Sequence, residues 1–362
     1  MTELARWIRE QIEVEVRVPF ARFMEWALYH PELGYYTGEK RKFGKAGDFY
    51  TSPGINPVFA EVLADQLAEK AEQLGEGTIS LIEFGAGEGM LARDVLDRWQ
   101  SAHPVLYERV DYRIVEISPS LQQVQQEMTA AHSRKLSWTS EAELAAGAPY
   151  RGAVLTNEFV DAFPVHRVVQ TKAGYAELYV AWDRESNSFV ETPAALSDHR
   201  LHAYLARYAP EMMVGQVTEV GLAGLDWYER ACSLLANGSM ITIDYGFDAQ
   251  MLHHKSRRNG TLRGFFQHRL IEDPFANIGL QDLTTDVNFT ALQELGERAA
   301  GRTEFYGSQS SYLLQAGILN RLQDVQSADL FRDPVMKRNR AIKQLILPGG
   351  IGDHFKVLVQ GF

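Results

Sequence analysis

The stretch LIEFGAGEGML, residues 81–91, places three glycines at alternate positions directly after a short apolar run. The apolar run is typical of a buried strand, and MLARDVLDRWQ, which begins at residue 90, has the spacing of a helix. A glycine-rich turn between a strand and a helix lets a nucleotide-like ligand come close to the backbone. The stretch therefore predicts a ligand-binding loop.

The glycine spacing argues against two common ligands. A dinucleotide site has the pattern G-x-G-x-x-G, but here the third glycine falls one residue early and Met90 takes its place. An ATP phosphate loop needs a lysine after the last glycine, and none follows Gly89. The pattern present is E-x-G-x-G-x-G, formed by Glu83, Gly85, Gly87 and Gly89.

Strand and helix patterns alternate along the chain from residue 78. Helical segments separate apolar runs at TISLIEF, DYRIVEI, GAVLTNEF and SMITIDYGF, which indicates a parallel sheet covered on both faces. The second of these strands ends at Glu116, where a carboxylate can accept hydrogen bonds from both hydroxyls of a ribose. The glycine loop alone could be a structural turn. Together with Glu116 it resembles the nucleotide-binding motif of Rossmann-like S-adenosylmethionine-dependent methyltransferases. Their cofactor carries an ammonium group, which a carboxylate such as Glu83 can bind, and it has no pyrophosphate.

Changes of pattern divide the chain into three parts. Residues 1–76 are expected to be mostly helical, with a long loop rich in glycine, aspartate, serine and proline. Residues 77–165 and 216–362 carry the alternating strands and helices of the core. The stretch between them is too long for one crossover helix, so residues 166–215 are predicted to form an inserted cap, a hairpin with its turn at Ala173-Gly174 followed by a helix.

Several short blocks are similar in sequence and order to the MidA-like methyltransferases. This family includes the mitochondrial arginine methyltransferase that assists assembly of respiratory complex I. The matching blocks are GYY at 34–36, GDFYTSP at 47–53, EFGAGEG at 83–89, VEISPSL at 115–121, NEFVDAFPV at 157–165, IDYGF at 243–247, GTLRGFFQH at 260–268 and DLTTDVNF at 282–289.

The resemblance implies an α/β fold, that of a Rossmann-like class I methyltransferase with a seven-stranded, mostly parallel sheet, an N-terminal helical extension and an inserted cap. It also implies S-adenosylmethionine as cofactor and methyl donor and, for the best understood members of the family, symmetric dimethylation of a protein arginine. Two departures bear on the substrate. Gly54 stands where the family usually has glutamate, and Asn288 stands where it usually has aspartate. The acceptor of this chain therefore need not be that of the better-known members.

The matched motifs also predict which residues contact the cofactor. These are Tyr36, Asp48, Ser52, Glu83, Gly85, Ala86, Gly87, Gly89, Glu116, Ile117 and Asn157. The N-terminal loop that contains Tyr36, Asp48 and Ser52 would close as a lid and keep water out. The alternative is that its aromatic residues pack between the N-terminal helices and the sheet.

Carboxylates just past the fourth strand are predicted to bind the methyl acceptor. A guanidinium is cationic and hard to deprotonate, and carboxylates can orient it through bidentate hydrogen bonds. Glu158 and Asp161 are therefore predicted to clamp the substrate guanidinium. The alternative is that Glu158 contacts the cap or the adenine side of the cofactor, while Asp161 caps a helix. His268 is a third candidate, as general base or substrate contact, and could equally be a structural histidine.

Composition narrows the classes of function. The formal net charge of −11 argues against a general nucleic-acid binder, which usually has a basic surplus. The ten histidines form no H-E-x-x-H motif and there is one cysteine, so no catalytic metal is expected. That cysteine, Cys232, lies in an apolar helical pattern and is expected to be a buried hydrophobic side chain rather than a nucleophile.

Location and partners follow from the remaining patterns. No run reaches the roughly 18 apolar residues of a membrane span, so no membrane insertion is expected. The N-terminus, MTELARWIREQIEVEV, has neither a secretory signal nor an Arg/Ser-rich transit pattern, which favours a bacterial cytoplasmic protein over one of the mitochondrial matrix. We expect a protein substrate and no nucleic acid, with a homodimer as one option. Two other functions stay open: a small-molecule methyltransferase, and a non-catalytic assembly factor that binds S-adenosylmethionine.

Overall fold

The computed structural model describes residues 1–38, 56–324 and 333–362. The chain forms two compact units, each built from segments that are distant in sequence. The first unit comprises Met1–Phe49, Val160–Tyr228 and Gly246–Leu292, and the second comprises Tyr50–Phe159, Glu229–Tyr245 and Gln293–Phe362. The sequence-based limits of the N-terminal region, the core and the inserted cap stay predictions.

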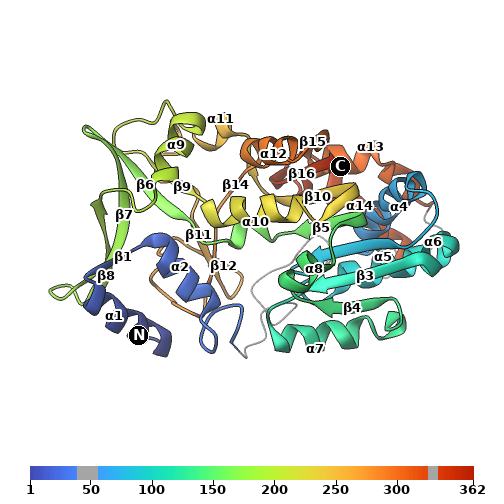
Figure 1. The fold of residues 1–362 in the computed structure, drawn as a ribbon, viewed down its shortest axis with the longest axis horizontal. Helices are drawn as coiled ribbons and strands as arrows, with labels where there is room; N and C mark the ends of the chain where they lie inside the picture. The colour runs from blue at the N-terminus through green and yellow to red at the C-terminus, as the bar shows by residue number, and fades with distance from the viewer. Residues whose placement is uncertain (39–55, 325–332) are drawn as a thin grey trace. The chain divides into compact units, whose positions relative to one another are not determined.

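The second unit is built on a mostly parallel β-sheet with the strand order β15-β16-β10-β5-β2-β3-β4. Figure 1 shows its labelled strands from β15 at the top to β4 at the bottom. The strands from β4 to β10 are parallel, whereas β16 runs antiparallel to both of its neighbours. Their bounds are β2 Ile79–Phe84, β3 Val110–Val115, β4 Leu136–Thr139, β5 Tyr150–Asn157, β10 Leu235–Phe247, β15 Arg302–Ser308 and β16 Phe355–Gly361.

The α/β class and the mostly parallel sheet are confirmed. The number of strands implied by the family resemblance, seven, stays a prediction. Among the described residues the same sheet has an eighth strand, β14 (Val287–Asn288), which pairs with Gly246 and Phe247 at the end of β10, within the first unit. This addition was not expected, because two residues are too few to give a strand pattern.

Helices alternate with the central strands, as the sequence pattern predicts. They are α4 Val58–Gln73, α5 Met90–Ala102, α6 Pro104–Arg109, α7 Pro119–Met128, α8 Glu141–Gly147, α10 Leu222–Cys232, α12 Phe289–Arg298, α13 Gln309–Gln315, α14 Pro334–Ile346 and α15 Ile351–His354. Helix α7 starts with Ser118 as N-cap and Pro119 at its first position. All six residues of β2 are buried, as expected of a strand covered on both faces.

The core of the second unit is apolar and close-packed around α4 and α5. Trp99 of α5 is fully buried, and its Nε1–H donates to the Ala64 carbonyl of α4 at 2.8 Å. Cys232 is also buried, and burial raises the pKa of its thiol to about 12. The prediction of a buried, unreactive cysteine is thus confirmed, because a thiol with so high a pKa is not a nucleophile near neutral pH.

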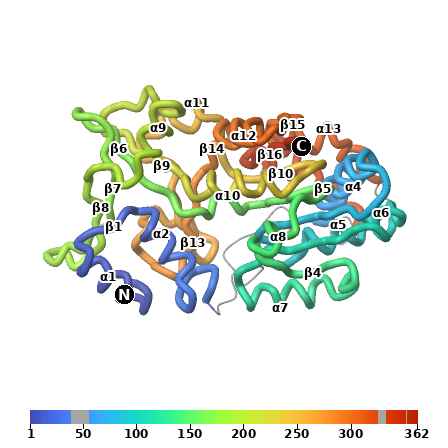
Figure 2. The backbone as a smooth tube through the Cα atoms, in the orientation of Figure 1, coloured from blue at the N-terminus to red at the C-terminus, as the bar shows by residue number. Residues whose placement is uncertain are grey.

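The first unit has an antiparallel sheet of five strands in the order β1-β7-β6-β9, with β8 paired to β7. Figure 2 traces its helices α1 and α2, which contact β1 and β7. The elements of this sheet are β1 Arg17–Pro19, β6 His166–Thr171, β7 Gly174–Asp183, β8 Ser188–Ala194 and β9 Val217–Val220, with α1 Glu3–Glu15, α2 Phe20–Tyr29 and α9 His199–Tyr208. The predicted hairpin is confirmed, but its turn lies one residue earlier than predicted, at Lys172-Ala173, because Gly174 already pairs with Thr171.

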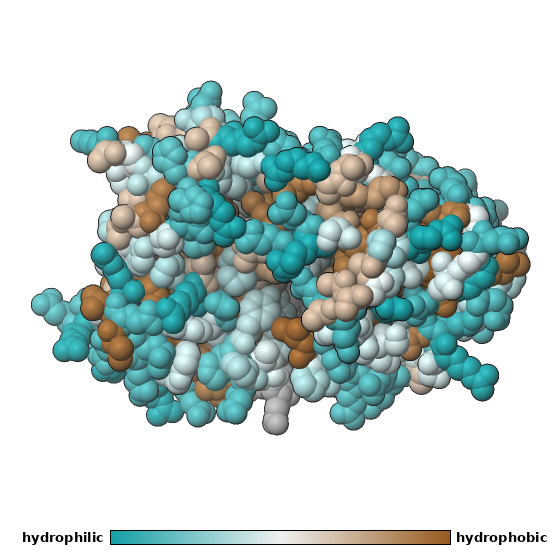
Figure 3. Space-filling model, viewed as in Figure 1, coloured by the Kyte–Doolittle hydropathy of each residue, from teal (hydrophilic) through white to brown (hydrophobic). Residues whose placement is uncertain are grey.

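A small second sheet completes the first unit. Its strands are β11 Arg263–Phe266, β12 Arg269–Ile271 and β13 Asp282–Thr284, with β11 in the middle, and short helices lie at η2 Val160–Ala162 and α11 Ala249–Leu252. Within the described part of the chain, no helix combines the length and the apolar composition that crossing a bilayer requires. The face shown in Figure 3 is covered mostly by hydrophilic residues, with small hydrophobic groups between them.

Candidate active site

The glycine loop, residues 85–89, joins β2 to α5 at the carboxyl edge of the parallel strands, where open α/β sheets bind ligands. Its three glycines have left-handed backbones, with φ between 55° and 82°. A Cβ at Gly85 would lie 2.5 Å from Cδ2 of Phe159, so only glycine fits under that ring. Gly87 differs, because a Cβ there would meet no atom of the described residues within 4 Å. Its backbone is therefore open to a ligand.

Glu83 lies one residue before the end of β2 and is 3% exposed. The hydroxyl of Tyr112, on neighbouring β3, donates to Glu83 Oε2 at 2.7 Å. Burial raises the pKa of Glu83 to about 7, and the hydrogen bond from Tyr112 opposes part of this rise. A cationic group beside the carboxyl would favour its charged form. Glu83 therefore suits the ammonium group of a ligand.

Glu116 follows β3 directly and is partly exposed. Its Oε1 accepts the backbone N–H of Ser118 at 2.8 Å, and its Oε2 accepts Nε2 of Gln125 at 3.1 Å. The next side chain, Ile117, is 62% exposed and offers apolar surface beside the carboxylate, whereas Ala86 of the glycine loop is nearly buried. A fixed carboxylate next to apolar surface suits a ribose and its attached base.

Asn157 and Glu158 stand where β5 ends. Asn157 Nδ2 donates to Glu158 Oε1 at 3.2 Å, while Asn157 Oδ1 is buried and has no hydrogen-bond partner among the described residues. Glu158 has a left-handed backbone with φ of 55°, which is uncommon for a residue with a side chain. Such conformations persist where the surrounding structure enforces them, often at functional sites.

The fully buried Asp244 of β10 holds this turn in place. Its Oδ2 accepts the backbone N–H of Phe159 at 3.1 Å, and the backbone N–H of Glu158 donates to the carbonyl of Ile243 at 2.9 Å. The block IDYGF was matched in sequence without a role for its aspartate. In the structure, Asp244 fixes the turn that presents Glu158.

Asp161 lies in η2 of the first unit and is 5% exposed. Burial raises the pKa of its carboxyl to about 7, and nearby Arg263 opposes the rise while Asp286 adds to it. Backbone N–H groups of Asp161 and Ala162 also hydrogen-bond this carboxyl. Hydrogen bonds from backbone N–H groups to this carboxyl are what the helix-capping alternative requires. The role of Asp161 in clamping the substrate guanidinium therefore stays a prediction.

Tyr36 belongs to the first unit as well. Its hydroxyl donates to both carboxylate oxygens of Asp282, each at 2.9 Å, and its ring stacks on Tyr29 at 5.5 Å. These contacts join two matched blocks, GYY and DLTTDVNF. The stacking of Tyr36 on Tyr29 is aromatic packing, which the alternative to a lid role for this loop predicts. The contact of Tyr36 with the cofactor stays a prediction.

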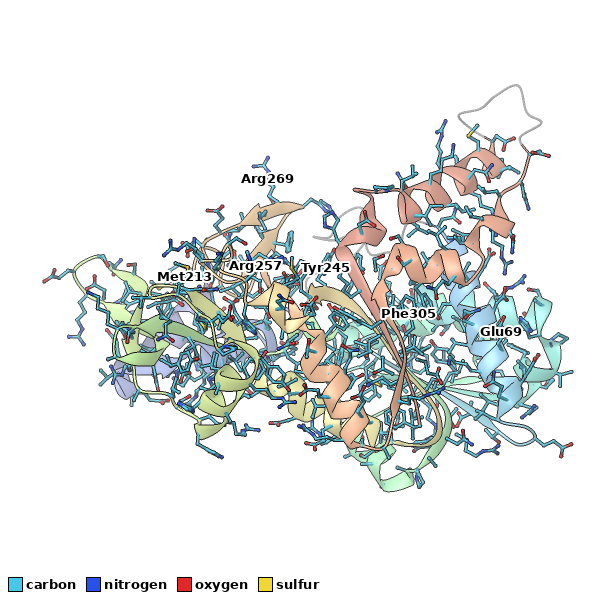
Figure 4. All side chains as sticks on the ribbon, turned by 90° about the horizontal axis from the view of Figure 1, so that it is seen from above. Glu69, Met213, Tyr245, Arg257, Arg269 and Phe305 are labelled. Carbon is cyan, nitrogen blue, oxygen red and sulfur yellow. The ribbon has the colours of Figure 1, made fainter. Side chains whose placement is uncertain are left out.

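His268 lies at the tip of the hairpin between β11 and β12 and is exposed. Gln267 and His268 form its two-residue turn, both with left-handed backbones at φ of 51° and 60°. This is the conformation of a type I′ hairpin turn, which normally takes asparagine and glycine. Arg269, the first residue of β12, points outward from the hairpin in Figure 4. The role of His268 as base or substrate contact stays a prediction.

Two predicted cofactor contacts, Asp48 and Ser52, lie outside the described residues, as does Gly54. In the described ranges, no group of three or more histidine, cysteine, aspartate or glutamate side chains is arranged to hold a metal ion.

The residues at the carboxyl edge of the second unit fit S-adenosylmethionine. Glu83 matches its ammonium group, Glu116 its ribose hydroxyls, and the open backbone at Gly87 allows the close approach that the ligand needs. The buried Oδ1 of Asn157 is a hydrogen-bond acceptor available to a ligand. No cationic residue occurs in the glycine loop, which agrees with a ligand that has no phosphate.

Sequence patterns missed three residues that support this edge: Tyr112, Gln125 and Asp244. Each is a polar side chain that is fully buried. Each contacts a predicted site residue or the backbone next to it. Of these three residues, only Asp244 could have been suspected from the sequence, because it lies in the matched block IDYGF.

The chain is similar in sequence to known proteins over most of its length. A family model described as "Putative S-adenosyl-L-methionine-dependent methyltransferase" matches residues 62–308. "Protein arginine methyltransferase NDUFAF7, mitochondrial" from Danio rerio is 29% identical over 369 residues, which cover 94% of this chain and 82% of the relative. The protein of the same name from Homo sapiens is 26% identical over 388 residues, which cover 98% and 82%.

Solved structures are similar as well. A crystal structure from Burkholderia thailandensis, bound to S-adenosyl-homocysteine, has a TM-score of 0.88 and 33% identity, and the match covers 99% of this chain and 92% of that one. A second crystal structure from the same organism has a TM-score of 0.86 and 32% identity, with 99% and 91% covered.

Proposed function

Since the chain belongs to the MidA-like family of S-adenosylmethionine-dependent methyltransferases, we propose that it methylates an arginine side chain of a protein. The observation that carries this proposal is the similarity of almost the whole chain to relatives named protein arginine methyltransferases. In line with the family resemblance, a subunit of respiratory complex I, or of its bacterial counterpart, is the first substrate to test.

Glu158 is the residue that we propose to bind the acceptor. When bound, S-adenosylmethionine supplies an electrophilic methyl group on its sulfonium. A carboxylate can accept two N–H bonds of a guanidinium, which orients the group, and it stabilises the positive charge that remains on the product. The backbone contacts of Glu158 and Phe159 with β10 hold this carboxylate at the end of β5. A fixed position is what collinear transfer requires of an acceptor-binding group.

Asp161 is a second candidate for acceptor binding. Since burial raises its pKa to about 7, part of the population is protonated at neutral pH. A guanidinium nearby would favour the charged form and lower that pKa. Binding of a cationic acceptor by Asp161 would therefore release protons near neutral pH, whereas a helix-capping Asp161 would not respond to the acceptor.

The proposal is tested with lysate from a strain that lacks the gene. Purified protein and S-adenosylmethionine with an isotopically labelled methyl group are added, and the labelled species are identified by mass spectrometry. We expect the label in dimethylarginine of one or a few proteins. The matched control is the Glu116→Ala variant, which should label much less because it lacks the carboxylate that we propose to bind the ribose hydroxyls. Label confined to small metabolites would overturn the proposal in favour of a small-molecule acceptor, and no label at all would favour a non-catalytic role.

A further inference from the structure

We propose that Gln125 is a positioning residue of the cofactor site. Its amide nitrogen donates hydrogen bonds to the glycine loop and to Glu116. Gln125 thereby fixes the loop, which lies at the amino-acid end of the site, relative to Glu116, which lies at the ribose end. Trp138 fixes the orientation of the amide. This inference concerns the methyl donor, so it holds for any acceptor and does not depend on arginine methylation.

Gln125 lies in the interior of the second unit, on α7, with none of its surface exposed. Its Nε2 donates to the Gly87 carbonyl at 2.9 Å and to Glu116 Oε2 at 3.1 Å. Its Oε1 accepts the indole N–H of Trp138, on β4, at 2.8 Å. The three partners come from the loop after β2, the loop after β3 and from β4. One side chain thus connects the carboxyl ends of three neighbouring strands.

The indole determines which way the amide points. An indole nitrogen can only donate a hydrogen bond, so the group facing Trp138 must be the amide oxygen. The amide nitrogen then faces the Gly87 carbonyl and the Glu116 carboxylate, which can only accept. In the flipped amide, oxygen would face these two acceptors and both contacts would be repulsive. All the hydrogen-bonding groups of the Gln125 amide are satisfied in one orientation.

The close approach of α7 to the glycine loop depends on Gly89. A Cβ at Gly89 would lie 3.3 Å from both Cα and Cγ of Gln125, tighter than ordinary van der Waals contact. An apolar side chain at position 125 could fill the same volume without the need for partners. A buried amide is costly unless it is hydrogen-bonded, so its presence here points to a use for its two N–H groups.

That use is to fix two ligand-binding groups. Glu116 receives one donor on each carboxylate oxygen, from Ser118 and from Gln125, which sets the plane of the carboxylate. The bond to the Gly87 carbonyl fixes the peptide plane in the loop that is open to a ligand. Glu116 is the predicted ribose ligand, so loss of Gln125 should reduce the part of the affinity that depends on the ribose hydroxyls.

The test measures binding by titration calorimetry with two ligands. One is S-adenosylhomocysteine and the other is its analogue without the 2′- and 3′-hydroxyls. The variants are Gln125→Leu, which nearly keeps the volume and removes the donors, and Trp138→Phe, which keeps an aromatic ring, smaller than the indole, and removes the N–H that orients the amide. The matched control is Gln126→Leu, the same change at the exposed neighbour on α7. Unfolding midpoints without ligand show that each variant is folded.

For Gln125→Leu we expect S-adenosylhomocysteine to bind about tenfold to a hundredfold more weakly, the range for a hydrogen bond to a charged group. The analogue should lose several-fold less, because it has no hydroxyls for Glu116 to bind. Trp138→Phe should also lose more affinity for S-adenosylhomocysteine than for the analogue, but both losses should be smaller. If Gln125→Leu does not fold, Trp138→Phe alone tests the proposal. Gln126→Leu should bind both ligands as the unmodified protein does. Equal losses for the two ligands in both variants, or no loss, would overturn the proposal.

Discussion

At the scale of single residues, the site depends on carboxylates whose surroundings differ. Glu83 is buried, with the hydroxyl of Tyr112 as its hydrogen-bond donor, and burial raises its pKa to about 7. Glu116 is partly exposed and receives two donors. The buried carboxyl gains most from a cationic ligand, because such a ligand replaces the missing solvation of its charge. Cofactor binding should therefore be linked to the proton of Glu83.

The first prediction is a pH dependence of cofactor binding. Below about pH 7 Glu83 must lose a proton before it can pair with an ammonium, so the affinity for S-adenosylhomocysteine should fall by up to about tenfold per pH unit as the pH is lowered. Titration calorimetry in buffers of different ionisation enthalpy would measure both the affinity and the proton release. The range from about pH 5.5 to about pH 8.5 extends roughly 1.5 units on either side of the pKa of Glu83. Glu83→Gln should bind more weakly at every pH and lose the dependence. A Glu83→Gln variant that keeps it would assign the titration to another group.

The unliganded protein should show the opposite trend in stability. The folded-state pKa of Glu83 is raised from 4.5 to about 7, so its contribution to the free energy of unfolding is fully present below about pH 4.5 and is lost as the pH rises through about 7. Glu83→Gln should remove that loss.

The second prediction concerns Tyr112, whose hydrogen bond lowers the pKa of Glu83. Tyr112→Phe keeps the ring and removes the donor, so the pKa of Glu83 should rise further. The pH at which cofactor affinity begins to fall should then move upward, with a loss in the free energy of unfolding of about 1 kcal/mol. Calorimetry over the same pH range measures the shift, and denaturant unfolding measures the stability. If the pH at which cofactor affinity begins to fall is unchanged or lower in Tyr112→Phe, Tyr112 does not act on the Glu83 carboxyl.

At the scale of elements, the glycine loop and the turn after β5 are shaped by their neighbours. Phe159 packs over Gly85, Gln125 packs against Gly89, and Asp244 holds the amide of Phe159. Of the three loop glycines, Gly87 is the one at which a Cβ would meet no described residue within 4 Å. The three glycines therefore serve two purposes: close packing at the ends of the loop, and ligand access at its centre.

The third prediction separates these purposes with Gly87→Ala and Gly89→Ala. Both place a Cβ on a left-handed backbone, which should lower the free energy of unfolding by about 1 kcal/mol. Gly89→Ala should lose about 1 kcal/mol more, because its methyl crowds Gln125. Gly87→Ala should lose cofactor affinity by about tenfold or more, because its methyl occupies the space that the ligand approaches, and it should lose more than Gly89→Ala, whose methyl disturbs the site only through Gln125. Denaturant unfolding and calorimetry would distinguish the two, and a Gly87→Ala variant with unchanged affinity would contradict this account of the loop.

At the scale of the whole molecule, the sequence predicts the second unit better than the first. The parallel strands were predictable because each is a short apolar run next to a helix with clear start signals such as Ser118 and Pro119. The antiparallel sheet of the first unit was predictable only as one hairpin. Its edge strand β1 pairs with β7, which is far away in the sequence: Arg17 lies opposite Ala181. Local periodicity carries no information about such long-range pairing.

The candidate site divides in the same way. Glu83 and Glu116 could be predicted as cofactor ligands because each stands near the end of a strand, where sheet geometry gives a carboxylate a role. Gln125 was missed because a glutamine on a helix normally faces water, and only the structure shows that it is fully buried. His268, Tyr36 and Asp161 were matched by motif, and their surroundings in the first unit leave their predicted roles as predictions.

The central claim is a division of labour, in which Glu83 and Glu116 bind the cofactor while Glu158 binds the acceptor. The most direct test is the dissociation constant of S-adenosylhomocysteine for Glu158→Gln, a variant in which methyl transfer should fall by about a hundredfold or more. We predict a constant within about twofold of the unmodified protein, because this change removes no cofactor contact and a twofold change is below about 0.5 kcal/mol. A loss of affinity as large as that of Glu116→Ala would contradict the claim and make Glu158 a cofactor ligand.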